Sequence, residues 1–426
     1  MKRPLLLIFL LTALSQWSCT DRCEQTRRYK RYTPVTLTVA QVRQGIRSEA
    51  ARELVNPGKI YAKGNYLFIN ELKQGLHIVD NTNPAAPRKV AFLAIPGNGD
   101  LAVRGNILYA DSYMDLVALN IADPLNVKEV GRVGDVFQSG QFDGAWWHSS
   151  GVGSVTLSDS RMDIVTETIK TDCENNGNSG IWRGGWLATS SFDSRALSSA
   201  APATSGQAGS MARFALYDRY LYTVSQSDMQ LFDIKNLEQP QRGAKINMGW
   251  GIETIFPYKD KLFIGSNSGM FIYDNANPSK PTLLSTFQHA FACDPVVVTD
   301  TRAYVTLRSG TNCRRGSDQL DVIDITNLSN PTLIKTYPMQ NPHGLGVDLP
   351  NLFICEGKHG LKSFDISSDL NVKQLEHLNN MDAYDVILLP NKLMLMIGKD
   401  GLYQFDYANP SQLRQVSVIP VKRLEI

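Results

Sequence analysis

The sequence predicts an all-β fold, a β-propeller of about seven four-stranded blades with an inserted cap between the second and third blades. Three observations support this prediction. Four short β-rich runs recur in each segment of roughly 40–50 residues, the third run ends in an acidic residue in nearly every copy, and Asn-Pro follows in several copies. Repeats also explain how 426 residues can fold together, because a single core rarely grows beyond about 250–300 residues.

The first copy of the repeat shows the pattern most clearly. Residues 59–70 hold its first two runs, residues 75–80 form the third, and residues 89–95 form the fourth. The polar residue that ends the third run recurs as Asp80, Asn120, Asp233, Asp274, Asp324, Asp365 and Asp406. Because such side chains accept hydrogen bonds from backbone N–H groups just ahead of them, we expect turns at these positions and not a catalytic set.

These copies resemble the family of LVIVD-repeat proteins, which is named after the third run. The motif stands here as Leu76-His77-Ile78-Val79-Asp80 and as Leu320-Asp321-Val322-Ile323-Asp324. The resemblance covers about residues 59–420 apart from the insertion. It implies a secreted or surface-attached β-propeller, and it implies no particular activity, because the family has no general assigned chemistry.

The N-terminus resembles a secretory signal peptide. Basic residues precede an apolar run at residues 5–14, which is too short to span a membrane, and the small Ser18 stands before Cys19. Residues 1–18 are therefore predicted to be a signal peptide. Cys19 resembles the lipid-acceptor cysteine of bacterial lipoproteins, although Gln16 stands where Leu is usual. We expect an exported protein that lipid on Cys19 holds at the outer membrane or cell surface, or a periplasmic or secreted protein if Cys19 is not lipidated.

The charge balance argues against a nucleic-acid partner. Loss of residues 1–18 removes Lys2 and Arg3 and no acidic residue, so the 43 basic residues fall to 41 and equal the 41 acidic ones. Proteins that bind nucleic acid normally carry an excess of positive charge. The basic cluster between Arg22 and Arg31 is local, and it either contacts anionic lipid head groups or is a solvated linker.

Residues 19–55 are predicted to form a tether that includes a strand and a short helix. The alternation over residues 35–39 suits a strand at the outer edge of a blade, and residues 41–54 suit a helix across the ring. The propeller itself is assigned to residues 56–425. Its last copy has its own fourth run near residues 413–421, so the ring needs no borrowed N-terminal strand.

An insertion at residues 138–211 separates the second and third copies. The antiparallel strand order places it on the face where the first strand of each blade begins and where the second strand turns into the third. We call this face the upper face. The insertion is rich in Gly and Ser but contains several Trp residues. Long loops are usually functional or disordered, and exposed Trp residues usually contact something, so Trp146 and Trp147 are expected to bind a ligand from an ordered cap.

A second candidate site lies where the innermost strands begin, at the mouth of the central channel. Alignment of the copies brings Lys59, Asp100, Arg213, Glu253, Asp294, His343 and Asp385 to one position. Such mixed charges suit a metal, a sugar or a charged small molecule, or they pair with one another. The subset most like a metal site is His343, Asp294 and Asp385, but it lacks a ligand spacing. We therefore assign no cofactor and leave a divalent metal open.

The cysteines predict one disulfide. Cys293 and Cys313 both map to the upper face of the fifth copy, which favours a bond between them in an oxidising envelope. Cys355 lies in an apolar run and is expected to be a buried thiol. The pairing of Cys23 and Cys173 is left open.

The motifs favour a binding protein over an enzyme without deciding between them. The sequence contains no Gly-x-Ser-x-Gly, no His-Glu-x-x-His and no phosphate-binding loop. We predict a binding or scaffold module of the cell envelope, with the channel mouth and the cap as its contact surface and an envelope protein or a glycan as its partner. The alternative is a channel-mouth enzyme, a metal-assisted hydrolase or lyase that acts on sugars or lactones. The oligomeric state is not predicted.

Overall fold

The computed structural model describes residues 22–142, 145–150, 156–172, 207–208, 212–288, 295–309 and 317–422. Two compact units make up the chain. Residues 1–34, 160–189 and 424–426 belong to the first unit, and residues 35–159 and 190–423 belong to the second. The predicted signal peptide, Cys19, Cys173, the predicted disulfide between Cys293 and Cys313, and Asp294 lie outside the described residues.

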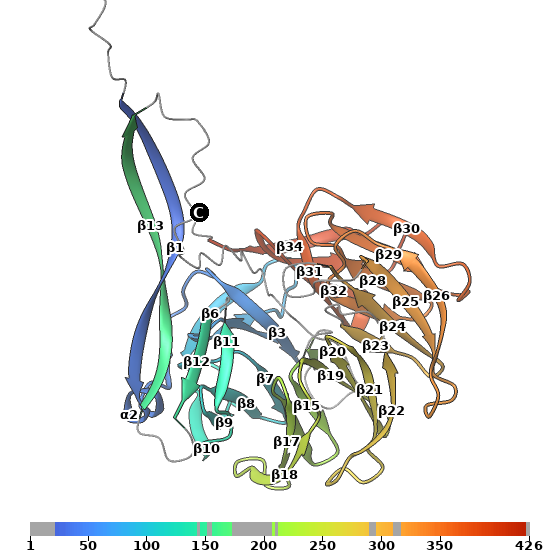
Figure 1. The fold of residues 1–426 in the computed structure, drawn as a ribbon, viewed down its shortest axis with the longest axis horizontal. Coiled ribbons are helices and arrows are strands. Elements are labelled where there is room, and N and C mark those ends of the chain that lie inside the picture. The colour runs from blue at the N-terminus through green and yellow to red at the C-terminus, as the bar shows by residue number, and fades with distance from the viewer. Residues whose placement is uncertain are drawn as a thin grey trace, which may run out of the picture. The chain divides into compact units, whose positions relative to one another are not determined.

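Seven sheets in the described part of the chain each contain four consecutive antiparallel strands, and they follow one another from blue to red in Figure 1. We number them blades 1 to 7. The strands of blades 1 to 4 are β3 (Pro57–Lys63), β4 (Tyr66–Glu71), β5 (Gly75–Asp80), β6 (Arg88–Ala94), β7 (Leu101–Arg104), β8 (Ile107–Ser112), β9 (Asp115–Asn120), β10 (Lys128–Val133), β15 (Phe214–Tyr217), β16 (Tyr220–Val224), β17 (Asp228–Asp233), β18 (Gln241–Asn247), β19 (Ile252–Tyr258), β20 (Lys261–Ser266), β21 (Gly269–Asp274) and β22 (Thr282–Gln288). The strands of blades 5 to 7 are β23 (Val296–Val298), β24 (Arg302–Leu307), β25 (Gln319–Asp324), β26 (Thr332–Pro338), β27 (Leu345–Asp348), β28 (Asn351–Cys355), β29 (Leu361–Asp365), β30 (Lys373–Leu378), β31 (Ala383–Leu389), β32 (Leu393–Gly398), β33 (Gly401–Asp406) and β34 (Arg414–Pro420), with the short 3-10 turn η3 (Pro390–Lys392) before β32.

The blades form a ring through their first strands and through shared apolar clusters. Each first strand contacts the next along the series β3, β7, β15, β19, β23, β27 and β31, so these strands surround the centre of the ring. One buried cluster joins Leu54 and Ile60 to Ile387 of blade 7. Leu54 also bridges to Val421, and its carbonyl accepts a hydrogen bond from the N–H of Lys422 at 2.7 Å. The predicted all-β propeller fold is confirmed, and the first blade meets the last without a shared strand.

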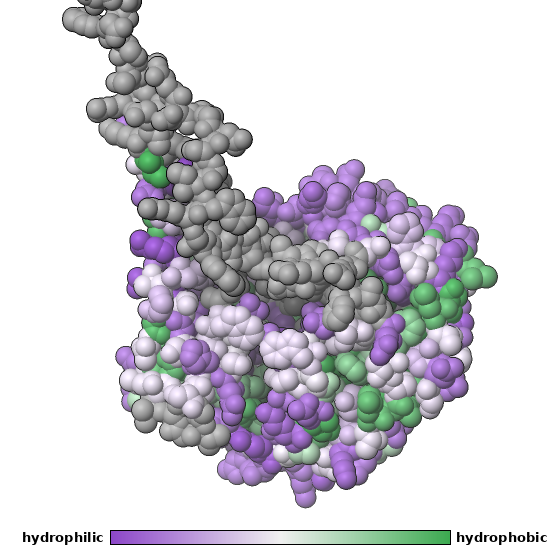
Figure 2. Space-filling view, in the orientation of Figure 1, coloured by the Kyte–Doolittle hydropathy of each residue, from purple (hydrophilic) through white to green (hydrophobic). Residues whose placement is uncertain are grey.

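The middle strands of a blade are apolar on both faces, which explains their continuous apolar runs in the sequence. In blade 4, every residue of β20 after Lys261 is buried, whereas β22 at the outer edge is exposed or half-buried along its whole length. Neighbouring blades cover both faces of the middle strands, so the polar and apolar alternation appears only toward the edge. On the face that Figure 2 shows, hydrophobic residues accordingly form separate patches among hydrophilic ones.

The repeated acidic residues make the turns that the sequence predicts. In all seven blades a side-chain oxygen at the end of the third strand accepts a hydrogen bond from the backbone N–H two residues ahead, at 2.8 to 3.2 Å. The acceptors are Asp80, Asn120, Asp233, Asp274, Asp324, Asp365 and Asp406. The hydrogen bonds from the Thr82 side chain and backbone, together with Arg88, lower the pKa of Asp80 to about 2. These residues therefore stabilise turns.

The segment before blade 1 differs from the expectation. The strand expected over residues 35–39 is the end of β1 (Arg22–Thr38), which belongs to a separate sheet and not to the outer edge of a blade. This sheet has the strand order β1-β13-β12-β11. The outer edge of blade 1 is instead extended by β2 (Arg47–Glu49), which pairs with β6. A two-residue strand, β14 (Gln207–Ala208), pairs with the inner edge of the same blade, at β3.

The helix expected over residues 41–54 is the shorter α2 (Val39–Arg43). It begins early because Thr38 caps it: the N–H of Gln41 donates to Thr38 Oγ1 at 3.2 Å, and the N–H of Thr38 donates to Gln41 Oε1 at 2.8 Å. Among the residues that the structure describes, no helix is long and apolar enough to cross a membrane.

The first unit contains the outer parts of β1 and β13 (Thr156–Asp172), which are neighbours in their sheet. Thr26 Oγ1 lies 3.2 Å from Thr168 Oγ1, and the Tyr29 hydroxyl donates to Glu167 Oε2 at 3.5 Å. These cross-strand contacts join the segment that follows the predicted signal peptide to the inserted segment.

Candidate functional site

The insertion after blade 2 begins as a hairpin. β11 (Ser139–Phe142) and β12 (Ala145–Ser149) pair in antiparallel fashion with Gln141 opposite Trp146, and β12 then pairs with the start of β13. We call β11 and β12 the cap hairpin. The connection that leads into it lies against the β8–β9 loop of blade 2, because the N–H of Val136 donates to the Met114 carbonyl at 2.7 Å. The hairpin therefore starts on the upper face, as the strand order predicts.

One buried carboxylate attaches the insertion to two blades. Asp159 of β13 accepts a hydrogen bond from the Tyr113 hydroxyl at 2.6 Å and an ion-pair contact from Lys73 Nζ at 2.7 Å. Tyr113 lies in the β8–β9 loop of blade 2, and Lys73 lies in the β4–β5 loop of blade 1. Burial and the bond to Asp159 both raise the pKa of the Tyr113 hydroxyl, so it stays a donor. This contact holds the base of the insertion on the upper face.

The two neighbouring tryptophans of β12 have different surroundings. Trp147 is 3% exposed and packs edge-on against Tyr113, with 5.3 Å between the ring centroids. Val42 of α2 and Leu157 of β13 belong to the same buried cluster. Gly140 lies directly over this indole, since a Cβ there would stand 2.5 Å from Trp147 Nε1. Trp147 therefore belongs to the core of the cap and is not presented to a ligand in this structure.

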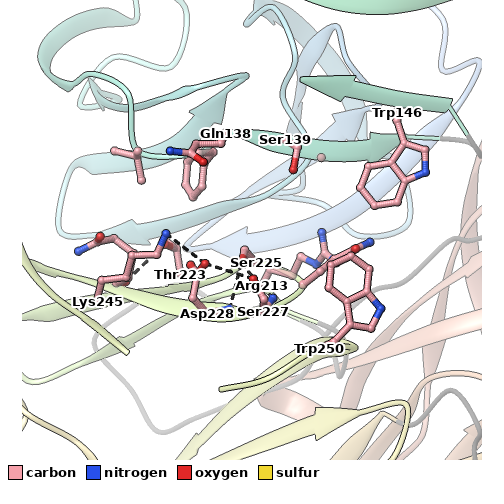
Figure 3. A pocket seen from close by; sticks show the side chains of 15 residues that line it. Gln138, Ser139, Trp146, Arg213, Thr223, Ser225, Ser227, Asp228, Lys245 and Trp250 are labelled. Carbon is pink, nitrogen blue, oxygen red and sulfur yellow. Dashed lines mark hydrogen bonds and ion pairs between the residues drawn. The ribbon is translucent and has the colours of Figure 1, made fainter. Parts of the chain in front are cut away.

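Trp146 points to the other side of the strand and is 45% exposed. It lines a cavity of about 150 Å³ between the cap hairpin and blade 3, which we call the hairpin pocket (Figure 3). Residues 136–140 line it from the blade 2 side. The rest of the lining comes from blade 3 and the connection to blade 4, namely Arg213, Thr223, Ser225, Gln226, Ser227, Asp228, Gln230, Lys245 and Trp250.

Trp250 is the second exposed aromatic residue of the hairpin pocket. It lies at the same end of the pocket as Trp146, which comes from the opposite side (Figure 3). Trp250 is 69% exposed and stands between Gly249 and Gly251, whose φ angles are +88° and +90°. Gly251 needs this conformation and has no room for a side chain, because a Cβ would stand 2.2 Å from the Asn267 amide oxygen. The loop thus presents the indole to solvent and to the pocket.

The polar side of the pocket is built on the β16–β17 loop. Ser225 Oγ accepts hydrogen bonds from the N–H groups of Ser227 at 3.1 Å and Asp228 at 3.0 Å, which fixes the loop. Asp228 forms an ion pair with Lys245 at 3.1 Å. The side-chain oxygen of Gln226 is buried and has no hydrogen-bond partner among the described residues. The pocket therefore offers both hydrogen-bond donors and acceptors.

Arg213 connects the hairpin pocket to the channel mouth. Its backbone N–H donates to Asp100 Oδ2 at 2.7 Å, and its carbonyl accepts from the N–H of Val224 at 2.8 Å. Asp100 is 4% exposed and also forms an ion pair with Lys59. Burial lowers the pKa of Lys59, opposed by Asp100, and the nearby charge of Arg213 adds to the lowering. Three of the aligned channel residues, Lys59, Asp100 and Arg213, therefore lie together.

Asp111 supports this group from blade 2. Its carboxylate accepts hydrogen bonds from the N–H groups of Gly99 at 2.8 Å and Asp100 at 2.9 Å, and from the Asn98 side chain at 2.8 Å. Burial raises the pKa of Asp111 to about 6 in spite of these donors. Asp100 and Asp111 thus hold backbone N–H groups, and Asp100 also pairs with Lys59.

The other aligned residues do not line the hairpin pocket. Glu253 lies on β19. His343 is 3% exposed, with Arg308 Nη1 at 2.8 Å from its Nδ1, and burial and this Arg lower the pKa of His343. Asp385 is 2% exposed on β31. Within the described ranges, no group of three or more His, Cys, Asp or Glu side chains is placed to hold a metal ion, and Asp294 is outside them.

Sequence reasoning missed several residues of the hairpin pocket, above all Trp250, Asp228, Lys245 and Gln226. A signal for one of them is present, since Gly249-Trp250-Gly251 follows the fourth strand of blade 3 and so maps to the upper face. The others lie within ordinary strands and loops of a repeat. Cys355 is a buried thiol, as predicted.

A ring of four-stranded repeats with a pocket beside an inserted hairpin defines a β-propeller with a candidate ligand site. The LVIVD-repeat family model matches two segments, residues 57–91 and 316–338, which include the two motif copies noted in the sequence. The chain is thus a β-propeller in which two segments match the LVIVD repeat. No curated protein is significantly similar to it in sequence.

A solved structure shares the fold. The chain is similar to the Pseudomonas aeruginosa periplasmic gluconolactonase PpgL, with a TM-score of 0.52 and 10% identity over 86% of this chain and 96% of that one. It is also similar to Saccharomyces cerevisiae Sqt1, with a TM-score of 0.48 and 8% identity over 88% of this chain and 87% of that one. At such low identity, the similarity to PpgL shows the fold alone.

Proposed function

We propose that the protein is a binding module of the cell envelope and that the hairpin pocket binds a saccharide. The observation that supports this most is the pair of exposed tryptophans, Trp146 and Trp250, at one end of a pocket with polar side chains. A sugar ring has apolar C–H faces that pack on an indole and hydroxyl groups around its edge that need donors and acceptors. Large exposed aromatic residues in a soluble protein usually mark an interaction surface.

The size of the pocket suits one ring of a longer chain. Its volume of about 150 Å³ is below the roughly 300–1,000 Å³ of pockets that enclose drug-sized ligands. A single sugar ring would occupy the cavity, and further rings would lie across the exposed faces of Trp146 and Trp250. An oligosaccharide or polysaccharide therefore fits better than a free monosaccharide. The proposed location in the envelope rests on the predicted signal peptide and on the predicted lipidation of Cys19.

A binding experiment with matched variants tests this function. The mature chain is screened against a panel of oligosaccharides, and affinities are measured by isothermal titration calorimetry. Trp146→Ala and Trp250→Ala are each expected to weaken binding about tenfold or more, because each removes a stacking surface. Leu370→Ala, which changes a residue that is 66% exposed in blade 6, serves as the control and should bind normally. Failure of every saccharide to bind, or full binding by both Trp variants, contradicts the proposal.

The same samples test the alternative of a channel-mouth enzyme. Product analysis of each oligosaccharide after incubation would detect cleavage or lactone opening. If the wild type turns a saccharide over, Asp100→Asn abolishes the turnover and Trp250→Ala does not, the functional site is at the channel mouth and not in the hairpin pocket. We expect no turnover.

A further inference from the structure

We propose that the hairpin pocket prefers saccharides that carry a carboxylate, and that Arg213 is the residue that recognises it. This inference rests on the proposed saccharide-binding function and names its ligand class. It begins from the charges around the pocket. Three side chains of the lining carry a charge: Arg213, Asp228 and Lys245.

Two of these charges cancel each other. Lys245 Nζ stands 3.1 Å from Asp228 Oδ2, and the Asp228 backbone is held by Ser225. The guanidinium of Arg213 has no hydrogen-bond or ion-pair partner among the residues that the structure describes. The pocket is therefore left with one uncompensated positive charge, and that charge lies on a planar group with several N–H donors.

The backbone of Arg213 is fixed on both sides. Its N–H is bonded to the buried Asp100 and its carbonyl to the N–H of Val224, at 2.7 and 2.8 Å. Asp100 is in turn held by Lys59 and by its own N–H bond to Asp111. Arg213 thus lines the pocket from an anchored position, and the residue is half-buried (Figure 3). An anchored, partly desolvated guanidinium binds an anion more strongly than one on a mobile loop.

The chemistry of the pocket favours a carboxylate on a sugar ring over a free anion. A guanidinium donates two parallel hydrogen bonds to a carboxylate. The indoles of Trp146 and Trp250 provide faces for the ring that carries it. An acidic sugar such as a uronic acid satisfies both features at once.

Pairs of ligands that differ only in charge test this inference. Oligogalacturonate, oligomannuronate and hyaluronan oligosaccharides are compared with their methyl esters by isothermal titration calorimetry on the mature wild-type chain. At least one acid should bind about tenfold or more tightly than its ester, and its affinity should fall as salt rises. A sulfated oligosaccharide of equal length should bind more weakly than the carboxylated one.

The variants assign the preference to Arg213. Arg213→Gln should lower the affinity for the acid to that for its ester and leave the affinity for the ester unchanged. Arg213→Lys should give an intermediate affinity for the acid. Arg219→Gln is the matched control, because Arg219 belongs to the same blade, is 51% exposed and lies outside the pocket. Thermal unfolding of each variant checks that it is folded.

The outcomes separate this inference from the function on which it rests. If esters or neutral saccharides bind as tightly as the acids, or Arg213→Gln weakens both members of a pair equally, the carboxylate preference is wrong and saccharide binding stands. Equal binding of sulfated and carboxylated chains also overturns it. If no saccharide binds, both proposals fail together.

Discussion

The turn after the third strand is built in the same way in every blade, whereas the residues of the upper face differ from one blade to the next. In each turn an Asp or Asn oxygen accepts the N–H two residues ahead. On the upper face, Lys59 and Asp100 form an ion pair, while Trp146 and Trp250 stand exposed beside Arg213. A hydrogen-bond acceptor that recurs at one position of every repeat stabilises the repeat, and the irregular positions are free to serve a ligand.

The inserted segment adds to this comparison, because it is not part of the repeat and is nevertheless firmly attached to the propeller. Trp147 and Asp159 hold it to blades 1 and 2, while Trp146, one residue from Trp147, faces the pocket. Adjacent residues of a strand point to opposite sides, so a single strand supplies both the attachment and the binding surface. Predictions about these residues therefore separate the stability of the cap from its binding.

Trp147→Ala should have the largest effect on stability. Removal of this buried indole leaves a cavity beside Tyr113, which is expected to lower the free energy of unfolding by about 4 kcal/mol. Urea unfolding measures the loss, and hydrogen exchange locates it in β11 to β13. Trp146→Ala, which changes an exposed neighbour, should unfold like the wild type. Equal stability of the two variants would show that the cap core is not organised around Trp147.

Asp159→Ala should have the second-largest effect on stability. The substitution removes the ion pair with Lys73 and the buried acceptor of the Tyr113 hydroxyl, so we expect a loss of roughly 3 kcal/mol in the free energy of unfolding. Denaturant unfolding at pH 7 provides the measurement. Asp163→Ala is the control on the same strand, because Asp163 pairs only with the exposed Arg161 in the described residues. A similar, small loss in both variants would mean that the buried carboxylate does not attach the cap.

Asp111 predicts a pH dependence of the opposite sign to that of the turns. Its pKa in the folded state, about 6, lies above the ordinary value of 3.8, so the protonated form is favoured by folding. Its contribution to stability is complete below pH 4 and is lost as the pH rises through about 6. Asp111→Asn should therefore reduce the change in the free energy of unfolding between pH 4 and 6. Above pH 6, the variant should be more stable relative to the wild type than it is at pH 4. An unchanged profile in unfolding experiments across this range would refute the assignment.

A single turn residue should give the smallest effect. Asp80→Asn keeps the acceptor for the Thr82 N–H, as Asn120 does in blade 2, and should leave the Tm at pH 7 nearly unchanged. Asp80→Ala removes the acceptor and should lower the Tm by about 2 °C. The folded pKa of Asp80, about 2, lies below its ordinary value, so its contribution is present above pH 4 and is lost as the pH falls toward 2. A larger loss at pH 7 than at pH 2 in Asp80→Ala, measured by thermal unfolding, checks the sign.

The sequence was sufficient to predict the fold, because the same pattern of strands and turns occurs several times along the chain. The position of the insertion followed from strand order alone. The sequence could not tell which of Trp146 and Trp147 faces the core. Alternation along a strand places the two side chains on opposite sides, but it does not say which side is buried. The contact of β1 with β13 joins residues far apart in the chain, and no local pattern in either strand indicates the other.

The candidate site was predicted only in part, for a similar reason. Arg213 and Trp146 were found, one from its position in the aligned repeats and one from its residue type in an insertion. Asp228 and Lys245 form the pair that leaves Arg213 as the uncompensated charge, and their contact depends on the register between β17 and β18. That register includes an irregularity between Gln230 and Phe232 that the alternation of residues does not reveal.

The indole N–H signals of the tryptophans give the most direct test of the central claim. In two-dimensional nitrogen–proton spectra of the mature chain, assigned with single Trp→Phe variants, a bound acidic oligosaccharide should shift the signals of Trp146 and Trp250 and leave that of the buried Trp147 in place. Arg213→Gln should reduce the shifts at the same ligand concentration to those that the methyl ester produces. Shifts at Trp147 alone, or binding measured by calorimetry with no change at Trp146 and Trp250, would contradict a binding site in the hairpin pocket.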